Sequence, residues 1–190
     1  MKRTLLTILT VCGIASAHAA LFEYSLSLTP VPGGSGTGSG SVLYDDVAHS
    51  LDLDVSWSGL SGNTTASHIH LPTSAPFTGT AGVVLTPGTL PGFPSGVTSG
   101  SYQTTLDLTS SATYPAAFIT SSGGTAADAE AAVIASFNEG TAYWNIHTST
   151  FGGGEINGFL TAVPEPSSLA LVGLGVVGMI LRVRSRRRVC

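Results

Sequence analysis

Hydrophobic and polar residues alternate along several stretches of this chain. The alternation is strictest in residues 21–29 (LFEYSLSLT) and 50–58 (SLDLDVSWS), where nearly every second residue is aliphatic or aromatic. Successive side chains of a strand point to opposite faces, so this period of two predicts strands with one buried face. Shorter stretches predict further strands over residues 39–45, 66–71, 82–86, 101–108, 141–148 and 155–162.

One segment has helical signals instead. Thr125 is followed three residues later by Asp128, a pair typical of an N-cap and its capping-box partner. Residues 126–138 are rich in helix formers, and we expect the helix to end at Gly140. We expect the large apolar side chains of this helix to face the core, namely Val133, Ile134 and Phe137.

Many short strands with a single helix predict a mainly β protein. We expect an antiparallel β-sandwich or small barrel. Residues 33–40 (GGSGTGSG) are interpreted as a flexible hairpin loop. They lack the Lys and the following helix that a phosphate-binding loop needs.

Both ends of the chain differ from this pattern. Met1-Lys2-Arg3, a short apolar run and then Ala17-His18-Ala19 are typical of a secretory signal peptide. We therefore interpret residues 1–19 as a signal helix cut by signal peptidase after Ala19, with Ala17 as the alternative. The two cysteines are Cys12 and Cys190, so the body between the ends has no thiol for catalysis, disulfides or metal thiolates.

The C-terminal segment, residues 163–190, combines a proline turn, an apolar run and a cationic end. The apolar run 169–181 is shorter than the ~20 residues that span a bilayer core, but its flanks lengthen it enough to predict a transient transmembrane helix in the inner membrane. Positively charged residues beside a membrane span stay on the cytoplasmic side, so we expect the arginine cluster after the apolar run to act as a cytoplasmic stop. The cluster consists of Arg182, Arg184, Arg186, Arg187 and Arg188.

This tail resembles the PEP-CTERM sorting signal of Gram-negative bacteria that make exopolysaccharide. The resemblance rests on the motif Val163-Pro164-Glu165-Pro166, the Gly-rich apolar stretch and the Arg cluster. It implies that an exosortase recognises the tail and cleaves near the Pro-Glu-Pro. The released body, residues 20–162, would then pass to the cell surface or the extracellular matrix.

The charge distribution separates the body from its ends. The formal net charge of the 190 residues is -4. Residues 21–163 contain ten acidic residues and no Lys or Arg, so their net charge is about -10. Phosphate neutralisation needs Lys and Arg, which excludes a nucleic-acid partner for the body.

The body also resembles the CHRD domain, a module named after chordin that occurs in bacterial exported proteins. The matching blocks are ASHIHL (66–71), GTAGVVL (79–85), the predicted helix before Gly140, and YWNIHT (143–148) followed by GGGEINGFL (152–160). The resemblance covers roughly residues 21–162. It implies an immunoglobulin-like β-barrel or sandwich and no established catalytic activity.

Histidines form the one chemical constellation of the body. His68 and His70 are two residues apart on a predicted strand, so both rings project from the same face. Together with His147 they are candidate ligands of copper or zinc, and Glu155 or an Asp is a candidate fourth ligand. The His-x-His pair is similar to the copper-ligand strand of copper-zinc superoxide dismutase, another β-sandwich. The alternative is a polar cross-strand cluster that supports the fold.

Two interpretations of function follow. The first is a non-enzymatic surface or matrix protein, associated with exopolysaccharide, biofilm or other surface proteins. The second is a periplasmic or extracellular protein that binds copper or zinc. Two weaker features are His49, expected to be exposed, and a calcium site among carboxylates, with a solvated strand face as its alternative. Those carboxylates are Asp45, Asp46, Asp52 and Asp54.

Overall fold

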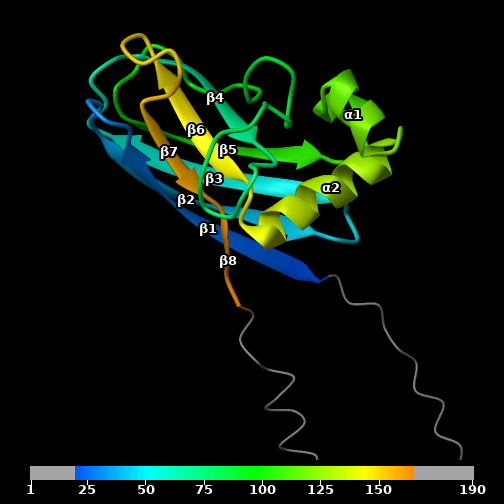
Figure 1. The fold of residues 1–190 in the computed structure, drawn as a ribbon. Coiled ribbons are helices and arrows are strands. Elements are labelled where there is room, and N and C mark those ends of the chain that lie inside the picture. The colour runs from blue at the N-terminus through cyan, green and yellow to red at the C-terminus, as the bar shows by residue number, and fades with distance from the viewer. Residues whose placement is uncertain (1–19, 165–190) are drawn as a thin grey trace, which may run out of the picture.

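The computed structural model of the protein describes residues 20–164, and these residues form a mainly β domain with two short helices (Figure 1). The first strands are β1 (Leu21–Pro30), β2 (Thr37–Asp45), β3 (Ser50–Ser58), β4 (Thr64–His70) and β5 (Gly100–Asp107). A 3-10 turn (Ser111–Thr113) then leads to the helices α1 (Ala116–Ser122) and α2 (Ala126–Glu139). The last strands are β6 (Tyr143–Thr148), β7 (Ile156–Phe159) and β8 (Thr161–Ala162).

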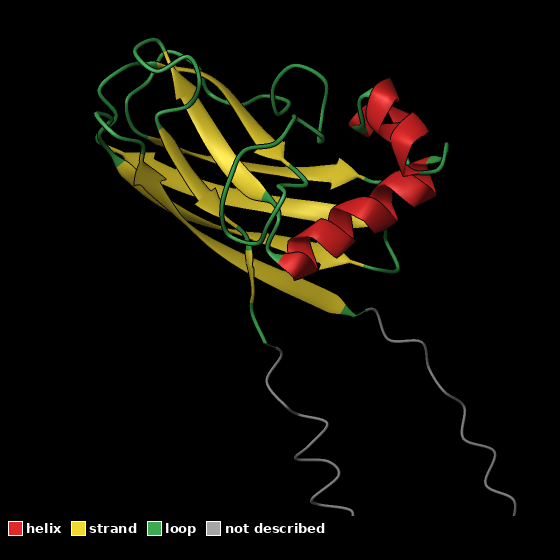
Figure 2. Ribbon diagram, in the orientation of Figure 1, coloured by secondary structure: helices red, strands yellow, loops and turns green. Residues whose placement is uncertain are grey.

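All strands belong to one antiparallel sheet in the order β4-β6-β7-β1-β2-β3-β5, with β8 beside β1. The sheet curls into a half-barrel (Figure 2). Strand β1 joins the two halves, because residues 21–28 pair with β2 while Thr29 and Pro30 pair with β7. The prediction of a mainly β antiparallel protein is confirmed. The expected sandwich or closed barrel is replaced by one continuous, open sheet.

The alternating stretches bury the faces that their patterns predict. Tyr24, Leu26 and Leu28 of β1 are buried, as are the four apolar residues of β3. Helix α2 packs on the inner face of β1 and β2, where the ring centroids of Phe137 and Tyr24 lie 5.1 Å apart. One apolar face per strand therefore supplies the core, as burial of apolar area requires.

Helix α2 begins and ends where its sequence signals place it. Thr125 and Asp128 form a reciprocal capping box, and Gly140 adopts the left-handed conformation at φ 68°. The expectation of a single helix is wrong, since α1 precedes α2. Residues 116–122 (AAFITSS) are rich in Ser, Thr and Ile, which are weaker helix formers, and their sequence therefore carries little helical signal.

Two predictions about the strands are corrected here. Residues 82–86 form no strand: Val83 makes a single bridge to His70, and the chain turns at Thr86 with φ 55°. Strand β2 already begins at Thr37, inside the predicted glycine loop. Its Gly40 packs so closely on β3 that a Cβ there would lie 2.3 Å from the carbonyl oxygen of Asp54.

The predicted strand 155–162 is divided into β7 and β8 at Leu160, whose backbone N–H donates to the carbonyl of Ala142. Beside β8, the backbone N–H of Val163 donates to the carbonyl of Glu23, so the two ends of the domain are adjacent.

The predicted signal helix and transmembrane helix lie outside the described residues. Among residues 20–164, no helix combines the length and apolar character needed to cross a membrane.

Candidate metal-binding site

The three candidate histidines lie together on the outer face of strands β4 and β6. The antiparallel register places Ala66 opposite His147 and His68 opposite Asn145. Because side chains alternate between faces, His68, His70 and His147 share the outer face. Ile69 and its cross-strand partner Trp144 point to the other face and are buried in the core. The prediction that these histidines converge is confirmed by their geometry. One nitrogen from each ring lies within 4.8 Å of the other two.

Each ring is oriented by a backbone carbonyl on its outer side. His70 Nδ1 lies 3.0 Å from the carbonyl oxygen of Ala81, and His147 Nδ1 lies 2.9 Å from that of Gly152. His68 Nε2 makes the same contact with the carbonyl oxygen of Gly88. A carbonyl oxygen only accepts, so each of these ring nitrogens carries the hydrogen.

In the neutral form of each ring, the other nitrogen, here called the inner nitrogen, is therefore left with a lone pair. His68 Nδ1 and His147 Nε2 face each other at 2.9 Å. His70 Nε2 is buried and has no hydrogen-bond partner among the described residues. Burial, the largest influence, lowers the pKa of both His68 and His70, which favours their neutral forms. Three acceptor nitrogens thus converge without a donor between them.

Neighbouring side chains fix the site further. The Tyr143 ring stacks on His70 with centroids 4.8 Å apart and an interplanar angle of 3°. Asn145 donates through Nδ2 to the carbonyl oxygen of Gly153, in the same loop whose Gly152 carbonyl contacts His147. Sequence reasoning missed both residues, although the alternation of Tyr143, Asn145 and His147 in YWNIHT places all three on one strand face.

The described domain corresponds to a known family. The family model of the CHRD domain matches residues 22–160. This chain belongs to the CHRD domain family. The model of the PEP-CTERM protein-sorting motif matches residues 162–188. No curated protein and no solved structure matches the chain significantly.

Glu155 of this CHRD domain does not join the histidines, so its expected role as a ligand is corrected. Its buried carboxylate accepts hydrogen bonds from the Thr148 hydroxyl at 2.7 Å and the Ser61 backbone N–H at 2.7 Å. Further donors are Ser35 N–H and Gly62 N–H. Burial by itself raises the pKa of Glu155, but these hydrogen bonds outweigh it and lower the pKa to about 2. The carboxylate joins three segments of the CHRD domain and is saturated by their donors.

The acidic residues considered for calcium are also dispersed. Asp52 and Asp54 lie on the outer face of β3 and accept hydrogen bonds from Thr105 and Gln103. The carboxylate of Asp45 accepts the backbone N–H groups of the following turn. Within residues 20–164, the three histidines are the only group of three potential ligands from His, Cys, Asp and Glu.

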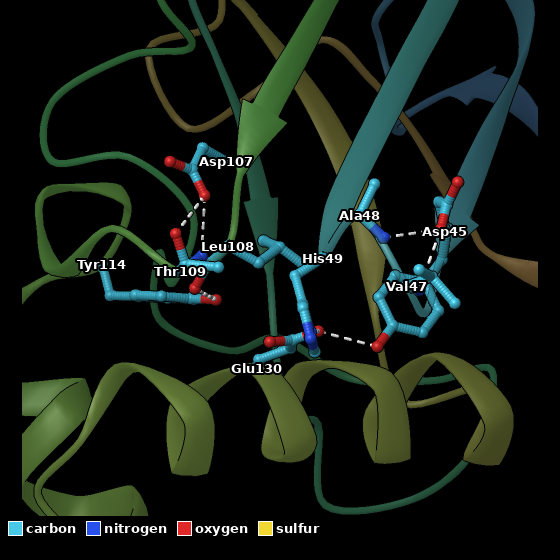
Figure 3. Close-up of polar contacts among 10 residues, drawn as sticks. Asp45, Val47, Ala48, His49, Asp107, Leu108, Thr109, Tyr114 and Glu130 are labelled. Carbon is cyan, nitrogen blue, oxygen red and sulfur yellow. Dashed lines mark hydrogen bonds and ion pairs between the residues drawn. The ribbon is translucent and has the colours of Figure 1, made fainter. Parts of the chain in front are cut away.

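His49 is exposed as predicted, but it has a specific partner. Its side chain is 49% exposed, and its Nδ1 lies 2.8 Å from Glu130 Oε1 of α2 (Figure 3). Tyr44 donates its hydroxyl to the same oxygen at 2.7 Å. The sequence separation of 81 residues explains why no local pattern indicated this pair. The contact between His49 and Glu130 connects the β2–β3 turn to helix α2 and is separate from the three-histidine group.

The sorting motif begins directly after the CHRD domain. Val163 and Pro164 are the last described residues, while Glu165, Pro166 and the arginine cluster lie outside the described residues. The PEP-CTERM motif implies an exported precursor that is anchored in the membrane and processed by an exosortase.

Proposed function

We propose that this protein is an exported, non-enzymatic CHRD domain that binds one copper or zinc ion. The ligands are His68 Nδ1, His70 Nε2 and His147 Nε2. The observation that carries the proposal is the convergence of three acceptor nitrogens on rings whose other nitrogens donate to backbone carbonyls. Metal-binding histidines are commonly oriented in this way, with the second nitrogen donating to a carbonyl or carboxylate.

The spacing of the nitrogens suits an imidazole-preferring metal. Zn–N bonds of about 2.0–2.1 Å in a tetrahedral arrangement separate ligand nitrogens by about 3.3 Å. The His68–His147 separation of 2.9 Å is slightly shorter, and the third nitrogen lies within 4.8 Å of both. To bind the ion, the rings would have to adjust until all three nitrogens lie about 3.3 Å apart. An ion would place positive charge where three lone pairs otherwise face one another.

The competing arrangement is a proton shared between His68 and His147. It requires one ring to be charged, and burial disfavours this for His68 by lowering its pKa. It also leaves the buried His70 Nε2 without a partner. A metal satisfies all three nitrogens at once, which is why the geometry favours it over the shared proton.

The proposal is tested by titrating the purified, metal-free protein with copper and with zinc. We expect one equivalent to bind, and binding to be lost in the double variant His68→Ala, His70→Ala. The matched control is His49→Asn, which removes a histidine outside the group and should leave binding unchanged. Absence of binding, or equal binding by the double variant, would contradict the proposed site.

We further propose that the released domain remains at the cell surface or in the extracellular matrix, in association with exopolysaccharide. Support comes from the PEP-CTERM motif and from the direct connection of that motif to β8. The test compares the wild-type chain with a variant that lacks residues 163–190. If both are found in equal amounts at the surface and in the medium, the sorting proposal is wrong.

A further inference from the structure

The outer surface of this domain lacks the groups that usually bind anions. Residues 20–164 contain ten carboxylates and no Lys or Arg. The histidine His49 is already paired with Glu130. A negatively charged surface repels negatively charged ligands. Binding of an acidic ligand to this domain therefore requires a positive charge from another source.

The proposed metal site would retain its full positive charge. Its three protein ligands are neutral imidazoles, and no Asp or Glu of residues 20–164 joins the group. The buried carboxylate of Glu155 is held by Ser35, Ser61 and Thr148 instead. A divalent ion in this site is therefore not neutralised by the described protein residues.

The site also has a free ligand position and access from solvent. Zinc sites with three protein ligands keep a fourth position for water or an external group. His70 is buried, whereas His68 and His147 are only partly buried. These two residues are the part of the group that is exposed to solvent, and an external ligand would approach the ion past them.

From these three observations, we infer that the metal ion binds a carboxylate of an external acidic ligand at its fourth position. This inference rests on the proposed metal site. The ion supplies the positive charge that the acidic domain lacks, and carboxylate oxygen is an established zinc ligand. The metal thereby makes an otherwise repelled acidic molecule into a ligand of this domain.

The test uses the purified protein loaded with Co²⁺, whose visible d–d absorption reports its coordination. Acetate is titrated as the carboxylate probe, and acetamide serves as the uncharged control of the same shape. We expect a saturable spectral change with acetate and an affinity for acetate at least about tenfold higher than for acetamide. The same measurement on His49→Asn should match the wild type.

The outcomes separate the two proposals. If Co²⁺, copper and zinc all fail to bind, the metal site itself is wrong and the inference falls with it. If the metal binds but acetate leaves the spectrum unchanged, the metal site stands and the inference is overturned. A response to acetate supports both. Retention of polygalacturonate or of poly-glutamate by the metal-loaded protein then identifies the source of the carboxylate as a sugar acid or an acidic peptide.

Discussion

His68 Nδ1 and His147 Nε2 lie 2.9 Å apart although the other nitrogen of each ring donates its hydrogen to a backbone carbonyl. Two neutral rings in this arrangement have no hydrogen for the contact between them. Backbone carbonyls from two different loops impose it, those of Gly88 and Gly152. The loops of this CHRD domain therefore fix the orientation of the two rings relative to each other.

We predict that zinc raises the thermal stability of the metal-free protein. A ligand that binds only the folded state stabilises it by about 2.7 kcal/mol at a concentration one hundred times its Kd. The rise in Tm should disappear in His147→Ala and persist in His49→Asn. Differential scanning calorimetry with and without zinc measures both. An undiminished rise in His147→Ala would mean that zinc binds elsewhere.

The loop that holds His147 is predicted to be sensitive at Gly154 and tolerant at Gly153. A Cβ on Gly154 would lie 1.9 Å from Asn145 Oδ1, and its φ of 109° is unfavourable for other residues. A Cβ on Gly153 meets no atom within 4 Å. We expect Gly154→Ala to lower the free energy of unfolding by about 1–3 kcal/mol and to weaken metal binding. Gly153→Ala is the matched control, and urea unfolding compares the two variants. Equal stability of Gly154→Ala and Gly153→Ala would refute the prediction.

Sequence patterns predicted the fold where one face of an element is buried. The alternation in β1 and β3 reflects burial of every second residue, and the capping box of α2 is a local interaction between Thr125 and Asp128. The apolar run at residues 82–86 misled because Val84 and Leu85 are buried from a loop rather than from a strand. Apolar composition without a period does not distinguish these cases. The curl of the sheet depends on long-range pairing of β1, which no local pattern encodes.

The candidate site was predicted in part for the same reason. The convergence of His68 and His70 follows from strand geometry alone, but the position of His147 depends on the register between β4 and β6. The carbonyl groups that orient the rings are backbone atoms, so residue identity does not reveal them. Glu155 was expected to join the site because spacing does not show that its carboxylate is saturated by backbone and hydroxyl donors.

Glu155 is predicted to stabilise the domain as an ionised group. Its Oε2 accepts the Thr148 hydroxyl at 2.7 Å and its Oε1 accepts the Ser61 backbone N–H. In Glu155→Gln an amide replaces one oxygen, which leaves buried donors unsatisfied at a cost of about 1–3 kcal/mol. Urea unfolding at neutral pH measures the loss. The control is the exposed Glu139→Gln, which should have little effect.

The same carboxylate predicts a dependence of stability on acid. The hydrogen bonds at Glu155 outweigh the effect of burial and lower its pKa from 4.5 to about 2. Its contribution is therefore complete above about pH 4.5 and is lost as the pH falls towards 2. The free energy of unfolding should fall over this interval more steeply in the wild type than in Glu155→Gln. Parallel curves would show that Glu155 does not titrate differently in the folded and unfolded states.

His49 is predicted to act in the opposite direction of pH. Its hydrogen bond to Glu130, and secondly the charge of that carboxylate, raise the pKa of His49 above 6.5. The neighbouring carboxylates of Asp45 and Asp46 act in the same direction. The stabilisation is thus complete below pH 6.5 and is lost as the pH rises through the raised pKa of the folded state.

The matched variant for this prediction is His49→Asn. His49 has a φ of 53°, and Asn tolerates this left-handed conformation better than most residues, so the substitution removes the titrating group without adding backbone strain. We expect the wild-type free energy of unfolding to fall relative to that of the variant as the pH rises above 6.5, because the other histidines titrate equally in both proteins. Urea unfolding across this range measures the difference. A wild-type curve parallel to that of the variant would show that the contact between His49 and Glu130 adds no pH-dependent stability.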